Sequence, residues 1–226
     1  MLENNQISSQ IIDLIIHNTN MHAILKDAKS GKCIDINSAH LSVYGFNNPN
    51  SIIGCTVWDM NTKMNKMWLD NATLVAKFDE KVIYTGSPVI KPKRAWLNAN
   101  GHVWLHSMSK IPVTNTKNRV IAILGSSSDL TNSLNINELY QYYCNFYQGQ
   151  FMRVSKFLEH TKVISLFNEI PSHAETIILI HKALISNNKQ IAGEIGIKLS
   201  TVESHINKLN QKTNQFQLVC NILRTW

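Results

Sequence analysis

A stretch near the C-terminal end decides the fold of that region: residues 189–212 read KQIAGEIGIKLSTVESHINKLNQK. Ala192, Gly196 and Val202 follow the spacing Ala-x3-Gly-x5-Val, which is typical of two short helices that cross closely. A small residue suits the crossing point, and glycine readily takes the left-handed backbone conformation that reverses the chain between the helices. The spacing therefore predicts a helix-turn-helix.

The second helix of this pair has one apolar side and one polar side. Val202, Ile206 and Leu209 recur at helical spacing and are predicted to face inward. The polar side carries groups that can bond to DNA bases or phosphates, and the candidate contacts, with Lys189 added from the first helix, are Thr201, Glu203, Ser204, Asn207, Lys208, Gln211 and Lys212. An ordinary helical hairpin with a solvated face is the alternative explanation of the same pattern.

The whole segment 170–226 resembles the LuxR-type, or GerE-like, DNA-binding domain, through Asn188–Ala192, Ile195–Ile197 and Thr201–Leu209. The resemblance implies four helices, over Ser172–Ile185, Lys189–Ile195, Leu199–Thr213 and Gln215–Arg224. The third would be the recognition helix of a bacterial transcription regulator. The family pattern places base contacts at Glu203, Ser204 and Asn207, and phosphate contacts near Thr201, Lys208 and Lys212.

The chain departs from this family pattern in several places, and two of them concern helix starts. Ile170–Ala174 replaces a common Leu-Thr-Pro-Arg-Glu, which removes a positive charge and a carboxylate near the first turn of the first helix. Lys198 stands where the recognition helix usually has a serine or threonine cap, so we expect this helix to start from Ser200 or to start loosely. We expect such changes to lower DNA affinity without removing the groove-facing residues.

Residues 21–131 show a different pattern, of short strands joined by tight turns. The predicted strands are His22–Leu25, Cys33–Ile36, Val89–Leu97, Val103–Ile111 and Arg119–Ser126, with small helices over Ser38–Tyr44 and Asn50–Ile53 and a longer helix over Lys66–Tyr84. Asn100-Gly101 is a strong hairpin signal because both residues tolerate positive φ. Pro92 predicts an edge strand or a bulge, because proline cannot donate to a sheet ladder.

In order and spacing, these pieces resemble a PAS domain. The similarity is carried by Ile34–Ala39 with Tyr44–Phe46, then by Ile52–Asp59, Asn98–Trp104 and Asp129–Thr131. The resemblance implies an antiparallel sheet flanked by helices, which senses a signal or mediates dimerisation.

Domains of this kind often hold a small ligand between sheet and helices. Four tryptophans, Trp58, Trp68, Trp96 and Trp104, are candidates for a ligand cavity, although packing in the core explains them as well. No cofactor is predicted. The flavin-binding Asn-Cys-Arg motif and the haem-binding histidine of the long helix are both missing. An unidentified small ligand stays open, and no metal site is expected.

Composition narrows the function classes. The 226 residues carry a formal net charge of +7 at pH 7, which suits a partner with phosphates but also fits an ordinary basic protein. The cysteines lie far apart and form no C-x-x-C pair, which indicates reduced thiols in a cytoplasmic protein. No secretory signal, membrane span or catalytic motif is visible, so we expect neither a membrane partner nor an enzyme.

The combined prediction is an α+β protein with an N-terminal helix (1–20), a PAS-like sensory domain (21–131), a helical linker (132–169) and a four-helix LuxR-type helix-turn-helix domain (170–226). The resemblances imply a signal-responsive regulator that binds double-stranded DNA as a homodimer, with RNA polymerase as a further partner. Two alternatives stay open. One is a protein-interaction module whose helical domain only dimerises, and the other is a ligand-binding protein without a DNA role.

Overall fold

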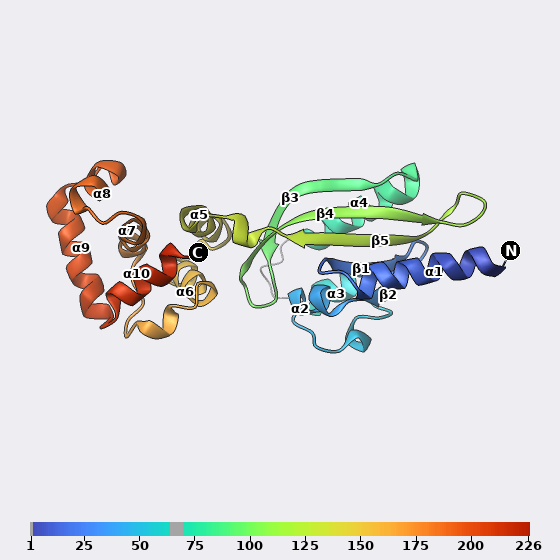
Figure 1. Ribbon diagram of the computed structural model, residues 1–226, viewed down its shortest axis with the longest axis horizontal. Helices are drawn as coiled ribbons and strands as arrows, with labels where there is room; N and C mark the ends of the chain where they lie inside the picture. The colour runs from blue at the N-terminus through green and yellow to red at the C-terminus, as the bar shows by residue number, and fades with distance from the viewer. Residues whose placement is uncertain (1, 64–69) are drawn as a thin grey trace. The chain divides into compact units, whose positions relative to one another are not determined.

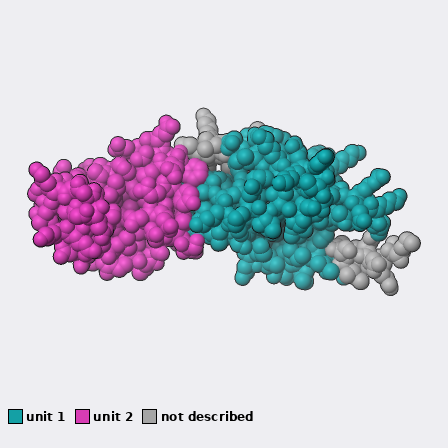
Figure 2. Space-filling view, turned by 90° about the horizontal axis from the view of Figure 1, so that it is seen from above, with its two compact units in different colours: residues 1–131 teal, residues 132–226 magenta. Residues whose placement is uncertain are grey.

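A computed structural model of the chain describes residues 2–63 and 70–226. These residues form two compact units, residues 1–131 and residues 132–226, which Figure 2 shows in different colours. All strands lie in the first unit, and the second unit is helical (Figure 1). The α+β fold class predicted from the sequence is thereby confirmed.

The first unit is built on a five-stranded antiparallel sheet. Its strands are β1 (His22–Asp27), β2 (Cys33–Ile36), β3 (Val89–Leu97), β4 (Val103–Thr114) and β5 (Val120–Asp129). They lie in the order β2-β1-β5-β4-β3, so the first and last strands of the chain pair inside the sheet. β3 is an edge strand, and its register with β4 shifts between Lys91 and Arg94, as the position of Pro92 predicted.

Helices cover both faces of this sheet (Figure 1). They are α1 (Leu2–His17), α2 (Ser38–Val43), α3 (Val57–Lys63) and α4 (Asn71–Thr85), with a 3-10 turn at Pro49–Ser51. Because side chains alternate along a strand, Ala23 of β1 packs with Ile16 of α1, whereas the next residue, Ile24, joins the core on the α2–α4 side. The sheet is therefore buried on both faces along β1.

Two details differ from the sequence prediction. α3 was not predicted as a separate helix. The long helix is described from Asn71 onward, so the predicted start at Lys66 and the cavity candidate Trp68 lie outside the described residues.

The turn after α2 depends on a glycine. Gly45 has a φ of 76°, and a Cβ atom there would lie 2.7 Å from Cβ of Ala99. Ala99 belongs to the turn between β3 and β4, where the predicted Asn100-Gly101 hairpin is present. The close approach lets the end of α2 contact this turn, where the Ala99 amide donates to the Val43 carbonyl at 3.0 Å.

The second unit contains six α-helices in its described residues. They are α5 (Ile136–Phe146), α6 (Gln150–His160), α7 (His173–Leu184), α8 (Asn188–Ile195), α9 (Leu199–Lys212) and α10 (Phe216–Arg224). The bounds of α7 to α10 agree within two residues with the four helices predicted for the C-terminal domain. None of the helices in the described ranges is long and apolar enough to cross a membrane.

α5 and α6, which fall in the segment predicted as a linker, pack into this second unit. The rings of Tyr140 and Tyr143 contact Phe157, with centroid distances of 4.8 and 6.0 Å. The Tyr140 hydroxyl also lies 2.7 Å from Nδ1 of His173, at the start of α7. The two helices thus pack on each other and reach α7, so they belong to the second unit.

Candidate nucleic-acid interface and ligand cavity

The turn between α8 and α9 is fixed by its backbone. Asn187 caps α8 by accepting a hydrogen bond from the amide of Lys189 at 2.9 Å. Gly196 ends α8 with a φ of 75°, and its amide and that of Ile197 donate to the carbonyl of Ala192, each at 3.0 Å. No atom lies within 4 Å of the place a Cβ would take, so conformation, not space, requires glycine here.

α9 buries one side and exposes the other. Val202 and Leu209 have no exposed surface, and Ile206 is half-buried beside them. Of the predicted DNA contacts, Glu203, Ser204, Asn207, Lys208 and Gln211 are exposed and Thr201 is half-exposed. Lys189 is exposed on α8. The exposed positions on α9 form what we call the polar face of α9.

Lys212 lies elsewhere. Its ammonium pairs with the carboxylate of Glu169 at 2.8 Å and with that of Glu175 at 3.0 Å, and only 16% of its side chain is exposed. These two acceptors raise its pKa, although burial alone would lower it. Two carboxylates already neutralise Lys212, which argues against the phosphate contact that the family pattern implies for it.

The sequence predicted that α7 lacks a carboxylate near its first turn, and this prediction was wrong. Glu175 supplies that group: its Oε2 accepts from the Ser172 amide at 2.7 Å, and its own amide donates to Ser172 Oγ at 3.2 Å. This reciprocal pair is a capping box. Burial alone would raise the pKa of Glu175, but Ser172 and Lys212 together hold it below its usual range.

The N-terminus of α9 has no side-chain cap. Lys198 occupies the cap position with an extended backbone, and its side chain makes no capping hydrogen bond. In the first turn the Thr201 amide donates to the Lys198 carbonyl at 3.0 Å, and the amides of Leu199 and Ser200 ahead of it are left to solvent or to an anion such as a phosphate.

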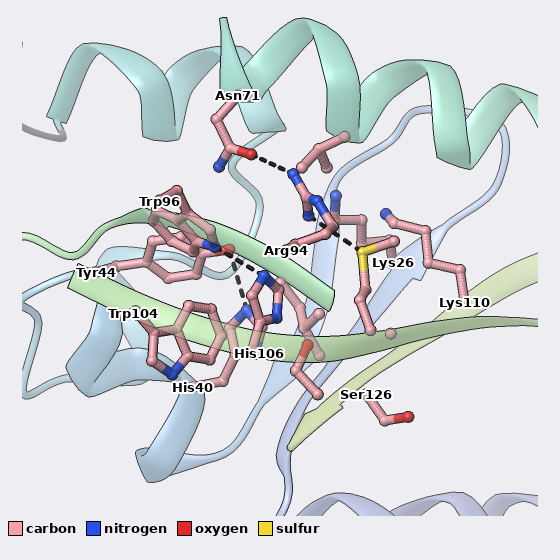
Figure 3. A pocket seen from close by; sticks show the side chains of 15 residues that line it. Lys26, His40, Tyr44, Asn71, Arg94, Trp96, Trp104, His106, Lys110 and Ser126 are labelled. Carbon is pink, nitrogen blue, oxygen red and sulfur yellow. Dashed lines mark hydrogen bonds between the residues drawn. The ribbon is translucent and has the colours of Figure 1, made fainter. Parts of the chain in front are cut away.

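The first unit contains a cavity between its sheet and helices α2 and α4 (Figure 3). Its volume is about 40 Å³. One water needs roughly 10–15 Å³, so the cavity has room for a few waters or a small ligand. Trp96 and Trp104 lie in its wall, as two of the four candidate tryptophans. Trp58 does not, because it is 52% exposed on α3.

Aromatic rings make up one side of the cavity. Trp96 and Trp104 meet edge to face with centroids 5.1 Å apart, and His106 stacks on Trp104 at 4.0 Å. Burial lowers the pKa of His106 to about 3, so its ring is neutral, and its Nε2 accepts a hydrogen bond from Trp96 Nε1 at 2.9 Å. This side of the cavity is uncharged and flat.

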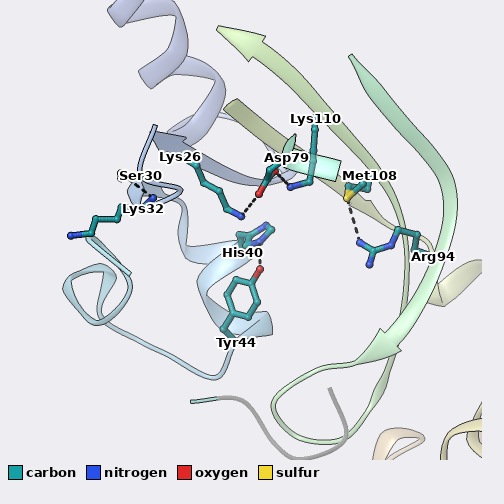
Figure 4. A network of polar contacts seen from close by, with 9 residues as sticks. All are labelled: Lys26, Ser30, Lys32, His40, Tyr44, Asp79, Arg94, Met108 and Lys110. Atoms are coloured by element: carbon teal, nitrogen blue, oxygen red, sulfur yellow. Dashed lines mark hydrogen bonds and ion pairs between the residues drawn. The ribbon is translucent and has the colours of Figure 1, made fainter. Parts of the chain in front are cut away.

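Basic side chains, none of them predicted from the sequence as cavity residues, lie on the other side of the cavity (Figures 3 and 4). Lys26 and Lys110 are almost fully buried, and both pair with Asp79 of α4. Arg94 of β3 lies beside them. The strand pattern does carry a signal for the two lysines. Each lies two residues after a buried residue of the same strand, so it occupies an inward position, where an apolar residue is normal.

Comparisons with known proteins reveal similarity of fold and no match of sequence. No protein-family model matches the sequence, and no curated protein matches it either. Among solved structures, VqmA of Vibrio cholerae in a ligand–DNA complex is 18% identical, with a TM-score of 0.46 over 96% of this chain and 88% of VqmA. A phage VqmA–DPO complex is 19% identical, with a TM-score of 0.47 over 97% and 88% of the two chains. The PAS domain of Bordetella pertussis BvgS is 18% identical, with a TM-score of 0.46 over 55% of this chain and 87% of that domain.

Proposed function

We propose that the chain is a sequence-specific DNA-binding transcription regulator of the cytoplasm, whose PAS-like unit senses a signal. The observation that carries the proposal is the division of α9 into two sides. Val202 and Leu209 lock its back against the unit, and the polar face is left open to solvent. A helix presented in this way, as the second of a helix-turn-helix, is suited to enter the major groove.

The chemistry of the polar face suits base reading. Asn207 can bond an adenine edge through two hydrogen bonds, and Glu203 can accept from the amino group of cytosine. Lys189, Lys198 and Lys208 are exposed and form no ion pair within the described ranges, so they are available to phosphates.

We further propose that the regulator binds as a dimer. One short recognition helix contacts too few base pairs to be both tight and selective. Two copies would place two α9 helices on a pseudo-palindromic site whose half-sites lie about one DNA turn apart.

Selection of bound sites from random duplex DNA, with the purified full-length chain, tests this proposal. We expect one enriched pseudo-palindrome. On that site Asn207→Ala should cost about 1–3 kcal/mol and relax the base preference at one position per half-site. Lys208→Met should instead weaken binding to all duplexes and lower the salt slope by about one unit.

Asn221→Ala is the matched control, because Asn221 is an exposed asparagine of α10, outside the two-helix motif. It should leave site preference and affinity unchanged. Failure to enrich any duplex would favour the alternative of a protein-interaction module. Equal losses from all three variants on selected and random DNA would contradict the assigned contacts.

A further inference from the structure

Positive charge exceeds negative charge at the basic side of the cavity (Figure 4). Lys26 and Lys110 are 4% and 5% exposed. Both share the carboxylate of Asp79, with Lys26 Nζ 2.9 Å from Asp79 Oδ2 and Lys110 on the other oxygen. Arg94 forms no ion pair among the residues that the structure describes, although the charge of Asp70 acts on it from farther away. Buried charges are costly unless they are paired, so this excess calls for an anion.

Hydrogen-bond donors are also in excess there. Each ammonium has three N–H donors, and the described part of the chain offers each of them one acceptor, on Asp79. Arg94 directs one Nη to Asn71 Oδ1 at 2.5 Å and the other to Met108 Sδ at 3.3 Å, and a thioether is a weak acceptor. A ligand with two acceptor oxygens would supply the hydrogen-bond acceptors that these donors lack.

The remaining wall of the cavity is aromatic, which favours an apolar group in the part of a ligand that lies away from the basic side chains. Trp96, Trp104 and Tyr44 present ring surfaces opposite the basic groups (Figure 3). Burial raises the pKa of Tyr44 and lowers those of His40 and His106, so this part of the wall carries no charge at neutral pH. Short apolar groups pack well on such rings.

We propose that this cavity binds a small organic carboxylate of a few heavy atoms, with the carboxylate at Lys26, Arg94 and Lys110 and a short apolar group against Trp96 and Trp104. The inference rests on the proposed sensory role of the first unit and names the chemical class of its ligand. It does not depend on DNA binding by the second unit.

Calorimetric titration of the full-length chain tests the proposal, with acetate and benzoate as probes and acetamide and benzamide as their neutral counterparts. We expect at least one carboxylate to bind tenfold or more tightly than its own amide, since the amide lacks the charge that Arg94 and the lysines complement. The better probe should also raise the melting temperature of the first unit.

Arg94→Gln removes a cation without emptying the cavity, and we expect it to weaken binding of the better carboxylate about tenfold while leaving amide binding unchanged. Lys93→Gln is the matched control, because Lys93 carries the same charge on the same strand but is exposed. Melting curves of both variants show that they remain folded.

The pH dependence gives a second readout. Burial and the charge of Lys26 lower the pKa of Lys110 to about 7, despite Asp79. The groups that face Lys110 are Lys26 of β1, Asp79 of α4 and Arg94 of β3, with uncharged His40, Tyr44 and His106 beyond them. A bound carboxylate favours the charged ammonium, so affinity should be several-fold higher at pH 6 than at pH 8.

Each result decides for or against the proposal. Preference of either probe over its amide, lost in Arg94→Gln and kept in Lys93→Gln, supports it. Equal binding of carboxylate and amide, unchanged carboxylate binding in Arg94→Gln, or no binding at millimolar concentration overturns it. In those cases site selection from duplex DNA can still succeed, so the failure is distinct from failure of the proposed DNA-binding function.

Discussion

At the scale of single residues, Lys198 is the position where the recognition helix can be improved. Its backbone, at φ −70° and ψ 145°, already has the cap conformation, but its side chain offers no acceptor. Lys198→Ser would supply a hydroxyl to accept from a first-turn amide. We expect it to raise the free energy of unfolding of the second unit by about 0.5–1 kcal/mol, measured by urea denaturation of the full chain.

Lys198→Ala separates this cap from the loss of charge. Both variants remove one exposed ammonium, so both should weaken binding to duplex DNA to the same extent, and only the serine variant should be more stable. A serine variant no more stable than the alanine one would show that other groups already satisfy the first turn of α9.

The role of a residue could be predicted from the sequence where its partners lie near it in the chain. Gly196 and Val202 lie within one short motif, so spacing alone assigned their roles correctly. Lys26, Asp79 and Lys110 come from three elements separated by long stretches of chain, and their meeting depends on strand order, which local spacing does not determine. The role expected for Trp58 was wrong because a tryptophan at the start of a short helix can face either way.

At the scale of elements, the helices of the second unit were the most predictable part. Their apolar positions recur at helical spacing, and caps at Ser172 and Asn187 mark two of the starts. What the sequence did not reveal is how α9 is held at its C-terminal end. Its last carbonyl, at Lys212, accepts from the Asn168 amide at 2.8 Å, and the Lys212 ammonium holds Glu175 of α7. This double attachment depends on the meeting of two distant segments.

The Glu175–Lys212 ion pair makes the stability of this unit depend on pH. The folded state holds the pKa of Glu175 below its ordinary value of 4.5, because Ser172 and Lys212 outweigh the opposing effect of burial. The stabilisation is therefore fully present above about pH 4.5 and is lost as the pH falls through the lowered folded value. At pH 7 we expect Glu175→Gln to cost about 1–3 kcal/mol of unfolding free energy.

Denaturation at a series of pH values checks this expectation. The difference between the native chain and Glu175→Gln should shrink as the pH falls below about 4.5, since the native carboxylate then becomes protonated. Glu169→Gln is the control: it removes the other partner of Lys212, but the Glu169 side chain is 72% exposed, so the cost should be well below that of Glu175→Gln. A pH-independent difference would contradict the role of the charge.

At the scale of the whole molecule, the two units carry the two proposed binding functions, one for a small carboxylate and one for DNA. A regulator must couple them. Coupling is reciprocal: a ligand that changes DNA affinity by some factor has its own affinity changed by DNA by the same factor. This equality can be tested without knowing the path between the sites.

We expect saturating carboxylate, the better of acetate and benzoate, to change affinity for the selected DNA site by roughly 5- to 150-fold, the usual range of allosteric coupling. Titration of the carboxylate into the preformed DNA complex should then give the same factor in ligand affinity. Arg94→Gln should lose the effect of ligand on DNA binding while keeping DNA affinity in its absence, and Lys93→Gln should keep both. Unequal factors would mean that the probe also binds elsewhere. Equal factors of one would mean that the two units act independently, and that the signal reaching DNA binding is not this ligand.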